Sequence, residues 1–211
     1  MRFSLLYCPA RAMLAGMIGL GLTGCISVLP KSKPAQLYRF GGDPSVTAPA
    51  QSTAPRFTVR NASIGFDHAA ATDRILTVRG NQAAYIGGAR WISPANTIFE
   101  AALTRAFDGH GGPARLVAAG EPAPGDFILR VDVRSFEARY EKGADAAPRI
   151  VVGVLAVLTD RKDGRIEARR LFEVASPAGS NSIHAITAAF GEAVRKILIE
   201  LVAWVDAKGQ S

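Results

Sequence analysis

Residues 150–174 read IVVGVLAVLTDRKDGRIEARRLFEV, two apolar runs joined by a short polar segment. The first run, residues 150–158, is apolar at both parities, which predicts a central strand covered on both faces. Lys162-Asp163-Gly164-Arg165 has the Asp-Gly composition of a hairpin turn. The returning strand then carries apolar residues at Ile166, Ala168, Phe172 and Val174. The stretch therefore predicts an antiparallel hairpin inside a sheet.

In residues 127–134, before this hairpin, apolar and polar side chains alternate, as in a strand with one buried face and one solvent-exposed face. Phe136 breaks the alternation, which indicates a β-bulge near Arg134-Ser135. Four more strand candidates lie upstream, at residues 37–40, 57–66, 75–79 and 83–86. The alternating residues are the apolar Phe127, Leu129, Val131 and Val133 and the polar Arg130, Asp132 and Arg134.

Two segments have the period of an amphipathic helix. In the middle of the chain, Ser93-Pro94 predicts a helix start, with the hydroxyl at the N-cap and proline at the first helical position. This helix is expected to run to about Phe107. The second helix runs from about Ile183 to Val205, with Asn181 or Ser182 available as its N-cap. Its apolar stripe is Ile186, Phe190, Ala193, Ile197, Leu201 and Trp204.

Strands interspersed with a middle helix and a long C-terminal helix predict an α+β two-layer sandwich. We expect both helices on one face of a mostly antiparallel sheet. Residues 37–211 form this domain, and the hydrophobic content of 48% over the whole chain is enough for a core. Within the domain, residues 41–55 have the Pro/Ala/Ser/Thr composition of a loop.

The first 24 residues are typical of a secretory signal that is removed on maturation. Arg2 and Arg11 precede an uncharged run at residues 12–23, which is shorter than the ~20 residues of a membrane-spanning helix. Leu22-Thr23-Gly24-Cys25 follows and resembles the bacterial lipobox, whose cysteine receives diacylglycerol, is cleaved free and is then N-acylated. The other interpretation is an ordinary signal peptide with an incidental, buried Cys25.

Lipidation of Cys25 would anchor the mature chain to the membrane. Each methylene buried in the bilayer contributes ~0.8 kcal/mol to the free energy of membrane binding, so several acyl chains together give a stable anchor. Residues 25–36 then form a tether that reaches roughly 35 Å when extended. Ile26 stands where sorted lipoproteins of the inner membrane carry aspartate, so the sequence predicts the periplasmic face of the outer membrane. Cys8 is lost with the leader, and no disulfide is expected.

The net charge narrows the choice of partner. It is +7 for the whole chain and +5 without Arg2 and Arg11. A periplasmic address excludes nucleic acid and leaves anionic lipid headgroups, lipopolysaccharide or an acidic protein surface. Because the charges are scattered, they are typical of a solvated surface.

Motifs for catalysis are absent from the sequence: it has no P-loop, no His-Glu-x-x-His, no paired CxxC and no GxSxG. His68, His110 and His184 lie in three separate elements without ligand spacing, and we expect them to be solvated or to cap helices. We predict no catalytic residue, no metal site, and no cofactor beyond the S-diacylglycerol and N-acyl groups on Cys25. Three aromatic residues are expected in the core rather than in a ligand-stacking platform: Tyr85, Trp91 and Phe99.

Several short motifs, taken in order, resemble the ABC-type transport auxiliary lipoprotein family over nearly the whole mature chain. Leu37-Tyr38-Arg39-Phe40-Gly41 is similar to the family's first strand after the tether. The family's pattern of Arg, then Tyr, then Trp opening a helix is matched by Arg79, Tyr85 and Trp91-Ile92-Ser93-Pro94.

The second half of the chain continues the resemblance. Asp126-Phe127-Ile128-Leu129 and Phe136 match a strand of the family, Lys162-Asp163-Gly164 its hairpin, and Trp204 its last helix. Two departures are the inserted Gly87-Gly88-Ala89 and the long segment at residues 41–55.

The resemblance implies a non-catalytic subunit of a lipid transport system, not an enzyme. In such a system an inner-membrane ABC ATPase and permease act with a periplasmic protein of the mammalian-cell-entry (MCE) type. The lipoprotein would dock that assembly at the outer membrane, and the cargo would be phospholipid or a related hydrophobic molecule. Docking on a ring-forming partner would favour a matching homo-oligomer.

Two other functions stay open from the sequence. One is a periplasmic lipoprotein that binds lipid or lipopolysaccharide and holds the cargo itself, which the net charge of +5 favours. The other is a surface-attached hydrolase, which requires a histidine within hydrogen-bond reach of a serine or a carboxylate.

Overall fold

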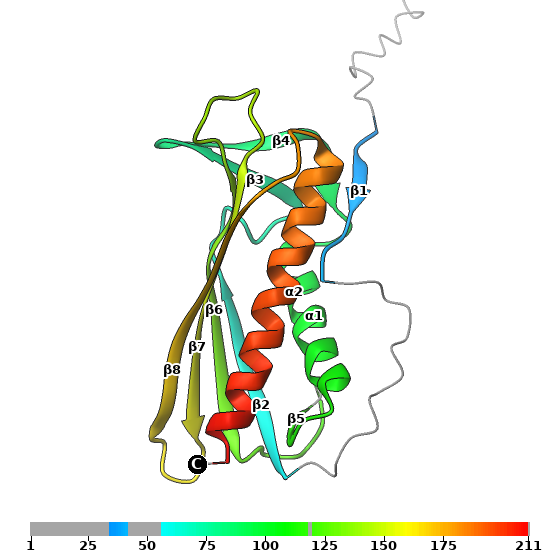
Figure 1. Cartoon of the computed structure of the whole chain (residues 1–211). Helices are drawn as coiled ribbons and strands as arrows, with labels where there is room; N and C mark the ends of the chain where they lie inside the picture. The colour runs from blue at the N-terminus through cyan, green and yellow to red at the C-terminus, as the bar shows by residue number, and fades with distance from the viewer. Residues whose placement is uncertain (1–33, 42–55, 118–119, 211) are drawn as a thin grey trace, which may run out of the picture. The chain divides into compact units, whose positions relative to one another are not determined.

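The computed structural model describes residues 34–41, 56–117 and 120–210 of the chain. From Pro34 onward the chain forms one compact unit, in which strands and helices pack as Figure 1 shows. The predicted leader, the lipobox Leu22 to Cys25, the first part of the tether and most of the loop predicted at residues 41–55 lie outside the described residues.

Eight strands form one sheet in this part of the chain, and two helices accompany it. Helix α1 spans Ala95–His110 and helix α2 spans Ile183–Lys208. One short strand, β5, was not predicted from the sequence. The strands are β1 (Gln36–Tyr38), β2 (Phe57–Phe66), β3 (Arg74–Arg79), β4 (Gln82–Trp91), β5 (Ala114–Val117), β6 (Phe127–Arg139), β7 (Arg149–Asp160) and β8 (Ile166–Pro177).

The sheet is mixed, which corrects the prediction of a mostly antiparallel sheet. Strand β6 pairs with β7 along one edge, while its other edge pairs first with β2 and then with β3. The antiparallel pairs are β3–β4, β6–β7 and β7–β8. The parallel pairs are β1–β4, β2–β5, β2–β6 and β3–β6. Every antiparallel pair joins strands that follow each other in the chain, whereas every parallel pair joins strands that do not.

Both helices cover the same face of the sheet (Figure 1). The prediction that β7 is covered on both faces is confirmed, since its even and odd positions are both buried. Val151 and Leu155 point to the face without helices, yet they are only 3% and 4% exposed. Side chains of the flanking strands cover them, since Leu155 lies between Asp132 and Leu171 in the register.

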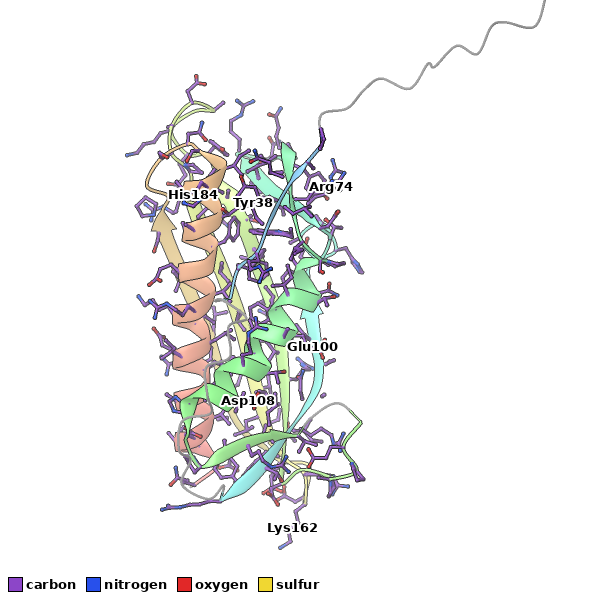
Figure 2. All side chains as sticks on the ribbon, turned by 90° about the vertical axis from the view of Figure 1, so that its right-hand side faces the viewer. Tyr38, Arg74, Glu100, Asp108, Lys162 and His184 are labelled. Carbon is purple, nitrogen blue, oxygen red and sulfur yellow. The ribbon has the colours of Figure 1, made fainter. Side chains whose placement is uncertain are left out.

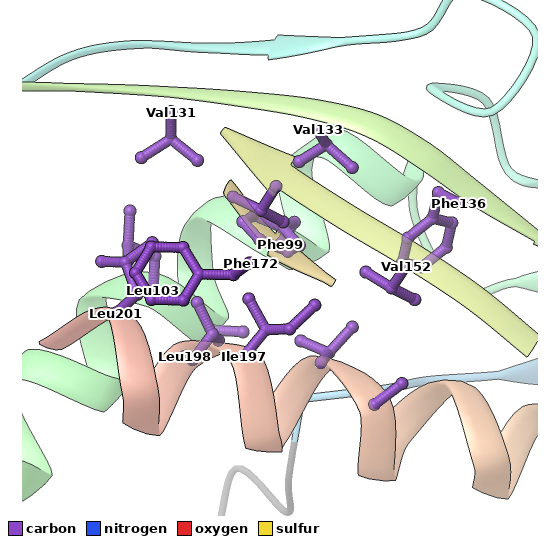
Figure 3. Close-up of a cluster of buried hydrophobic side chains, with 14 of the residues drawn as sticks. Phe99, Leu103, Val131, Val133, Phe136, Val152, Phe172, Ile197, Leu198 and Leu201 are labelled. Atoms are coloured by element: carbon purple, nitrogen blue, oxygen red, sulfur yellow. The ribbon is translucent and has the colours of Figure 1, made fainter. Parts of the chain in front are cut away.

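The core lies between the sheet and α2, as predicted from the helical stripe. Phe190, Ile197 and Leu201 are at most 1% exposed, and Figure 3 shows Ile197 and Leu201 facing the side chains of β6 and β7. The β6 alternation is also confirmed, because Leu129 and Val131 are fully buried.

Two bulges shape the long strands. The predicted bulge in β6 is confirmed by a register shift between Val133 and Ser135. A larger one occurs in β4, where the pairs Leu76–Tyr85 and Arg74–Arg90 leave several extra residues in β4. Gly88 lies in this bulge with a φ of +72°, a conformation that favours glycine. The inserted Gly87-Gly88-Ala89 is therefore accommodated as a bulge and not as a loop.

The helix ends differ partly from the prediction. Pro94 is itself the N-cap of α1 and no side chain caps this end, so Ser93 does not have the predicted capping role. The helix also extends past Phe107 to His110. In α2, Ser182 is the N-cap and its hydroxyl accepts the Ala185 N–H at 3.2 Å. Asn181 instead contacts the β6–β7 loop by accepting the Tyr140 hydroxyl.

A hydrogen-bonded clamp fixes the start of β6 to β2. The Asp126 carboxylate accepts the Thr58 N–H at 2.7 Å and the Thr58 hydroxyl at 2.8 Å, and the Asp126 N–H donates to the Thr58 carbonyl at 2.8 Å. The bonds from the Thr58 backbone, and then from its hydroxyl, lower the pKa of Asp126 below its ordinary value.

This clamp predicts a pH dependence of stability. A carboxyl whose pKa is lower in the folded protein adds stability above its unfolded pKa of ~3.9, and that stability is lost as the pH falls through the folded value. We expect the melting temperature of the wild type to fall more steeply below about pH 4 than that of Asp126→Asn, which has no proton to take up there. Melting curves of both proteins test this, and parallel curves would contradict it.

Candidate functional site

Strand β1 brings the start of the described chain onto the domain. It pairs in parallel with β4, matching Gln36–Tyr38 to Ala89–Trp91. The pairing continues one residue further, because the Ile92 N–H donates to the Tyr38 carbonyl at 2.7 Å. Three paired residues alone form a weak attachment, so side-chain burial has to add to it.

Phe40 supplies that burial, since its ring is 2% exposed. Its ring centroid lies 4.9 Å from Trp91 and 5.0 Å from Phe136, and Phe190 of α2 lies 5.4 Å from Trp91 and 4.8 Å from Phe136. Burying a phenylalanine contributes about 1.5–3 kcal/mol, and aromatic pairs add to this. The aromatic cluster of Phe40, Trp91, Phe136 and Phe190 therefore fastens β1 to β4, β6 and α2.

The chain leaves this cluster through Gly41. Its φ is +80°, in the left-handed region, and a Cβ at this position would lie 2.6 Å from the Ala102 Cβ of α1. Glycine is thus required here on two counts, backbone conformation and close approach to a helix.

Two shallow grooves flank β1 and share Leu37, which is 60% exposed. The first lies between β1 and the N-terminal part of α2, and the second lies between β1 and the start of α1. Ile92, which is 48% exposed, lines the second groove. The first is lined by residues 37–41 with His184, Thr187, Ala188 and Gly191, and the second by Leu37 and Ile92 with Ala71, Thr72, Asp73, Trp91, Ser93, Pro94, Asn96 and Thr97.

The electrostatics of the two grooves favour a negative partner. Among the residues that line them, Asp73 is the one carboxylate, and it is paired with Arg90 at 2.9 Å. Arg39 adds a positive charge to the first groove. Helices α1 and α2 both begin beside these grooves and neither has an acidic residue in its first turn, so the positive ends of both helix dipoles are not offset there.

A third hollow of about 310 Å³ lies between the β3–β4 hairpin and the β6–β7 loop. Arg79 is at its edge and donates to Gln82 at 3.2 Å. Burial raises the pKa of the Tyr140 phenol, whose hydroxyl donates to Asn181 at 2.8 Å and so holds the loop against the start of α2. The hollow is lined by Thr77, Arg79, Gln82, Ala84, Ile86, Tyr140 and Ala144.

The structure separates the residues that the sequence grouped by motif. Tyr38, Trp91 and Phe136 come together around β1, with Pro94 beside the second groove. Arg79 and Tyr85 lie in the β3–β4 hairpin. The guanidinium carbon of Arg74 lies 3.8 Å from the centroid of the Tyr85 ring. The Tyr85 hydroxyl donates a hydrogen bond to the Ala69 carbonyl at 3.1 Å. Trp204 packs on Phe172, near the opposite end of α2.

Sequence reasoning missed the roles of Phe40 and Phe190 as partners of Trp91. Phe190 was assigned to the apolar stripe of α2, which is correct, but no local pattern links that stripe to β1. Leu37 and Ile92 were also missed as an exposed pair. Each of them is a large apolar residue near the end of a strand. Single exposed apolar residues are common on protein surfaces, so the sequence alone does not single out these two.

His110 is exposed at the end of α1, as expected, but it also has a partner that the sequence did not indicate. Its Nε2 lies 3.0 Å from Asp206 Oδ2, and the other carboxylate oxygen accepts the Ala114 N–H at 3.0 Å. Asp206 is 8% exposed. The contact that a hydrolase would require is thus present, but both carboxylate oxygens are engaged in joining the ends of α1 and α2 to β5, which is a structural role.

This junction predicts a loss of stability in Asp206→Ala. The Ala114 N–H would lose its buried partner, and we expect the free energy of unfolding to drop by about 1–3 kcal/mol. Urea unfolding measures it. Asp108→Ala, at an exposed position in the same region, is the control and should change stability by less than about 0.5 kcal/mol. Equal effects of the two substitutions would show that the junction does not stabilise the fold.

Two general features of the described residues bear on function. No helix within residues 34–41, 56–117 and 120–210 is long and apolar enough to cross a bilayer. The same part of the chain holds no group of three or more His, Cys, Asp or Glu side chains placed to bind a metal ion.

Comparison with known proteins places the domain among transport lipoproteins. Residues 38–202 match the family described as ABC-type transport auxiliary lipoprotein component, while no curated protein sequence matches significantly. A solved structure from Xanthomonas campestris, of the DUF330 family, is 26% identical with a TM-score of 0.68, and the match covers 83% of this chain and 97% of that one.

Two further solved structures share the fold at 12% identity. An uncharacterized protein has a TM-score of 0.63, with 82% of this chain and 99% of its own covered. A protein from Chlamydia trachomatis has a TM-score of 0.51, with 74% of this chain and 98% of its own covered.

Proposed function

The chain belongs to the ABC-type transport auxiliary lipoprotein component family, and from this membership we propose that it is a non-catalytic docking subunit of an ABC transport system. Cys25 carries the diacylglycerol and N-acyl groups, and these hold the domain at the periplasmic face of the outer membrane. The partner is the periplasmic MCE protein of the system, and the cargo is phospholipid or a related hydrophobic molecule.

The observation that carries this proposal is the family match over residues 38–202, almost all of the folded domain. The attachment of β1 supports it. The chain enters the domain at a strand held by the buried Phe40, so a pull on the tether is transmitted to the core. A tethered domain meets its partner at a high effective concentration, which makes weak docking sufficient to bridge two membranes.

Binding of the purified periplasmic part of the MCE protein encoded nearby tests the docking role. We expect the acylated chain in vesicles to retain it, and not to retain an MCE protein from a different transport system. Deletion of the gene should also impair lipid trafficking between the membranes. Absence of both effects would overturn the proposal. A homo-oligomer matching a ring-shaped partner would appear as a multiple of the chain mass in the same preparation.

A second function, holding the cargo itself, is favoured by the hollow beside Arg79. Its walls include Ala84, Ile86 and the Tyr140 ring, and Arg79 lies where an anionic headgroup would sit. Native mass spectrometry of a gentle preparation would then show bound lipid, and Ala84→Trp, which fills the hollow, should remove it. A lipid-free mass for the wild-type domain supports docking alone.

A further inference from the structure

Two exposed apolar side chains lie side by side at the point where the tether joins the domain. Leu37 and Ile92 line the same groove and are 60% and 48% exposed. Leu37 lies opposite Arg90 in the register, and the Ile92 N–H donates to the carbonyl of Tyr38, the residue after Leu37. The other large exposed apolar side chains of the described residues, Ile166, Leu171 and Ile199, are on β8 and α2 and line neither groove.

The number of residues between Cys25 and Leu37 limits how far Leu37 and Ile92 can lie from the membrane. Leu37 follows Cys25 by twelve positions. Even fully extended, these residues span no more than roughly 40 Å. Once Cys25 is acylated, the pair therefore stays close to the headgroups of the leaflet that holds the lipid.

The charge around the pair fits an anionic surface. Arg39 lies two positions after Leu37 along the chain. Asp73, the one carboxylate among the described residues that line the grooves, is already paired with Arg90. The starts of α1 and α2 face the same region without acidic residues in their first turns. Figure 2 shows Tyr38, Arg74 and His184 at this end of the domain and Lys162 at the other.

We propose that this surface, formed by Leu37, Arg39, Ile92, Asn96 and His184 and here named the tether face, rests on the anionic phospholipid headgroups of the membrane that holds Cys25. The inference rests on the proposed lipidation of Cys25 and adds an orientation to it. Apolar side chains enter the headgroup boundary while cations and helix N-termini meet phosphates. Each contact is weak, but the tether turns it into an intramolecular contact.

The consequence is a fixed orientation of the domain. Figure 2 shows Lys162, in the β7–β8 turn, at the opposite end of the domain from Tyr38 and His184. With the tether face on the membrane, this end of the domain lies farthest from the point where the tether enters. The surfaces at that end are then the ones presented to a partner that arrives from the other side of the periplasm.

The test uses the acylated mature protein in phosphatidylcholine vesicles that contain about a quarter phosphatidylglycerol. A nitroxide is attached at Asn96→Cys or, for comparison, at Lys162→Cys, both of which are exposed positions. A nickel chelate attached to lipid headgroups relaxes nitroxides that lie near the membrane. We expect the label at position 96 to relax several-fold faster than the label at position 162, and the difference to shrink in pure phosphatidylcholine.

The double variant Leu37→Asp/Ile92→Asp, with the label at position 96, should lose most of this difference. The matched control is Ile166→Asp/Leu171→Asp, which changes two equally exposed apolar residues elsewhere and should keep it. Equal relaxation at the two labelled positions, or no effect of the first double variant, would overturn the proposal. Nitroxide–nitroxide broadening at position 96 would also overturn it, because a second copy would then occupy the face.

The same preparation distinguishes the lipidation of Cys25 from the orientation of the domain. If the mass of the mature protein lacks the acyl groups and the protein does not stay with vesicles, the lipidation of Cys25 is wrong. If the protein is acylated and retained but both labels relax equally, lipidation stands and the orientation alone is wrong.

Discussion

Phe136→Ala is expected to lower the free energy of unfolding by about 3–5 kcal/mol. The Phe136 ring is 3% exposed and lies 4.8 to 6.2 Å, centroid to centroid, from four other aromatic rings. Those rings come from the segment after β1, from β2, from β4 and from α2. Removing the Phe136 ring therefore removes a contact from each of these elements at the end of the domain where the tether enters, here named the tether end. The rings are Phe40, Phe66, Trp91 and Phe190.

Calorimetry of the full chain measures this effect. A loss of 1 kcal/mol shifts the melting temperature by about 2–4 °C in a domain of this size, so a shift of about 6–20 °C is expected. Leu171→Ala is the matched control, because Leu171 is apolar and 53% exposed, and it should shift the melting temperature by no more than about 2 °C. A shift as small as this for Phe136→Ala would show that the aromatic cluster does not hold the tether end together.

Cys25→Ala is expected to abolish incorporation of labelled palmitate. The chain has two cysteines, Cys8 and Cys25, and we propose that the second receives all of the acyl groups. One acyl chain gives marginal membrane binding and several give stable anchoring, since each buried methylene contributes ~0.8 kcal/mol. The variant should therefore also be lost from the outer membrane fraction.

Cys8→Ala is the control that the chain itself offers. It should still take up palmitate, because Cys8 lies in the part of the sequence that we expect to be removed. Palmitate retained by Cys25→Ala, or lost from Cys8→Ala, would contradict the assignment of the lipobox to Leu22-Thr23-Gly24-Cys25. Either result would also remove the support for the tether face, which depends on a short chain from Cys25 to Leu37.

β1 and Phe40 join the start of the described chain to the rest of the fold. β1 contributes only three residues to the sheet, and Phe40 follows it into the aromatic cluster. Phe40 belongs to the same core cluster as the rings of β4, β6 and α2, so Phe40→Ala is expected to weaken both the attachment of β1 and the packing around Trp91 and Phe136.

What the sequence determined by itself is the local structure with a clear period. The stripe from Ile186 to Trp204 identified α2 and its buried face, and the change of parity at Phe136 located the bulge between Val133 and Ser135. The Lys162-Asp163-Gly164-Arg165 turn indicated the β7–β8 hairpin. These features depend on residues close in the chain, whose side-chain directions follow from backbone geometry alone. Membership of the family could also be inferred, because motif order is a property of the chain.

Only the tertiary structure decided how distant segments meet. All four parallel strand pairs join strands that are not consecutive, and nothing in a strand's own pattern names a partner far along the chain. The same holds for Phe40 against Phe190 through Trp91 and for His110 against Asp206. Apolar residues at both parities predicted that β7 is covered on both faces, but they did not reveal that neighbouring residues on β6 and β8 cover Leu155. Such contacts are set by how the whole core packs, and that is a property of the fold and not of any one segment.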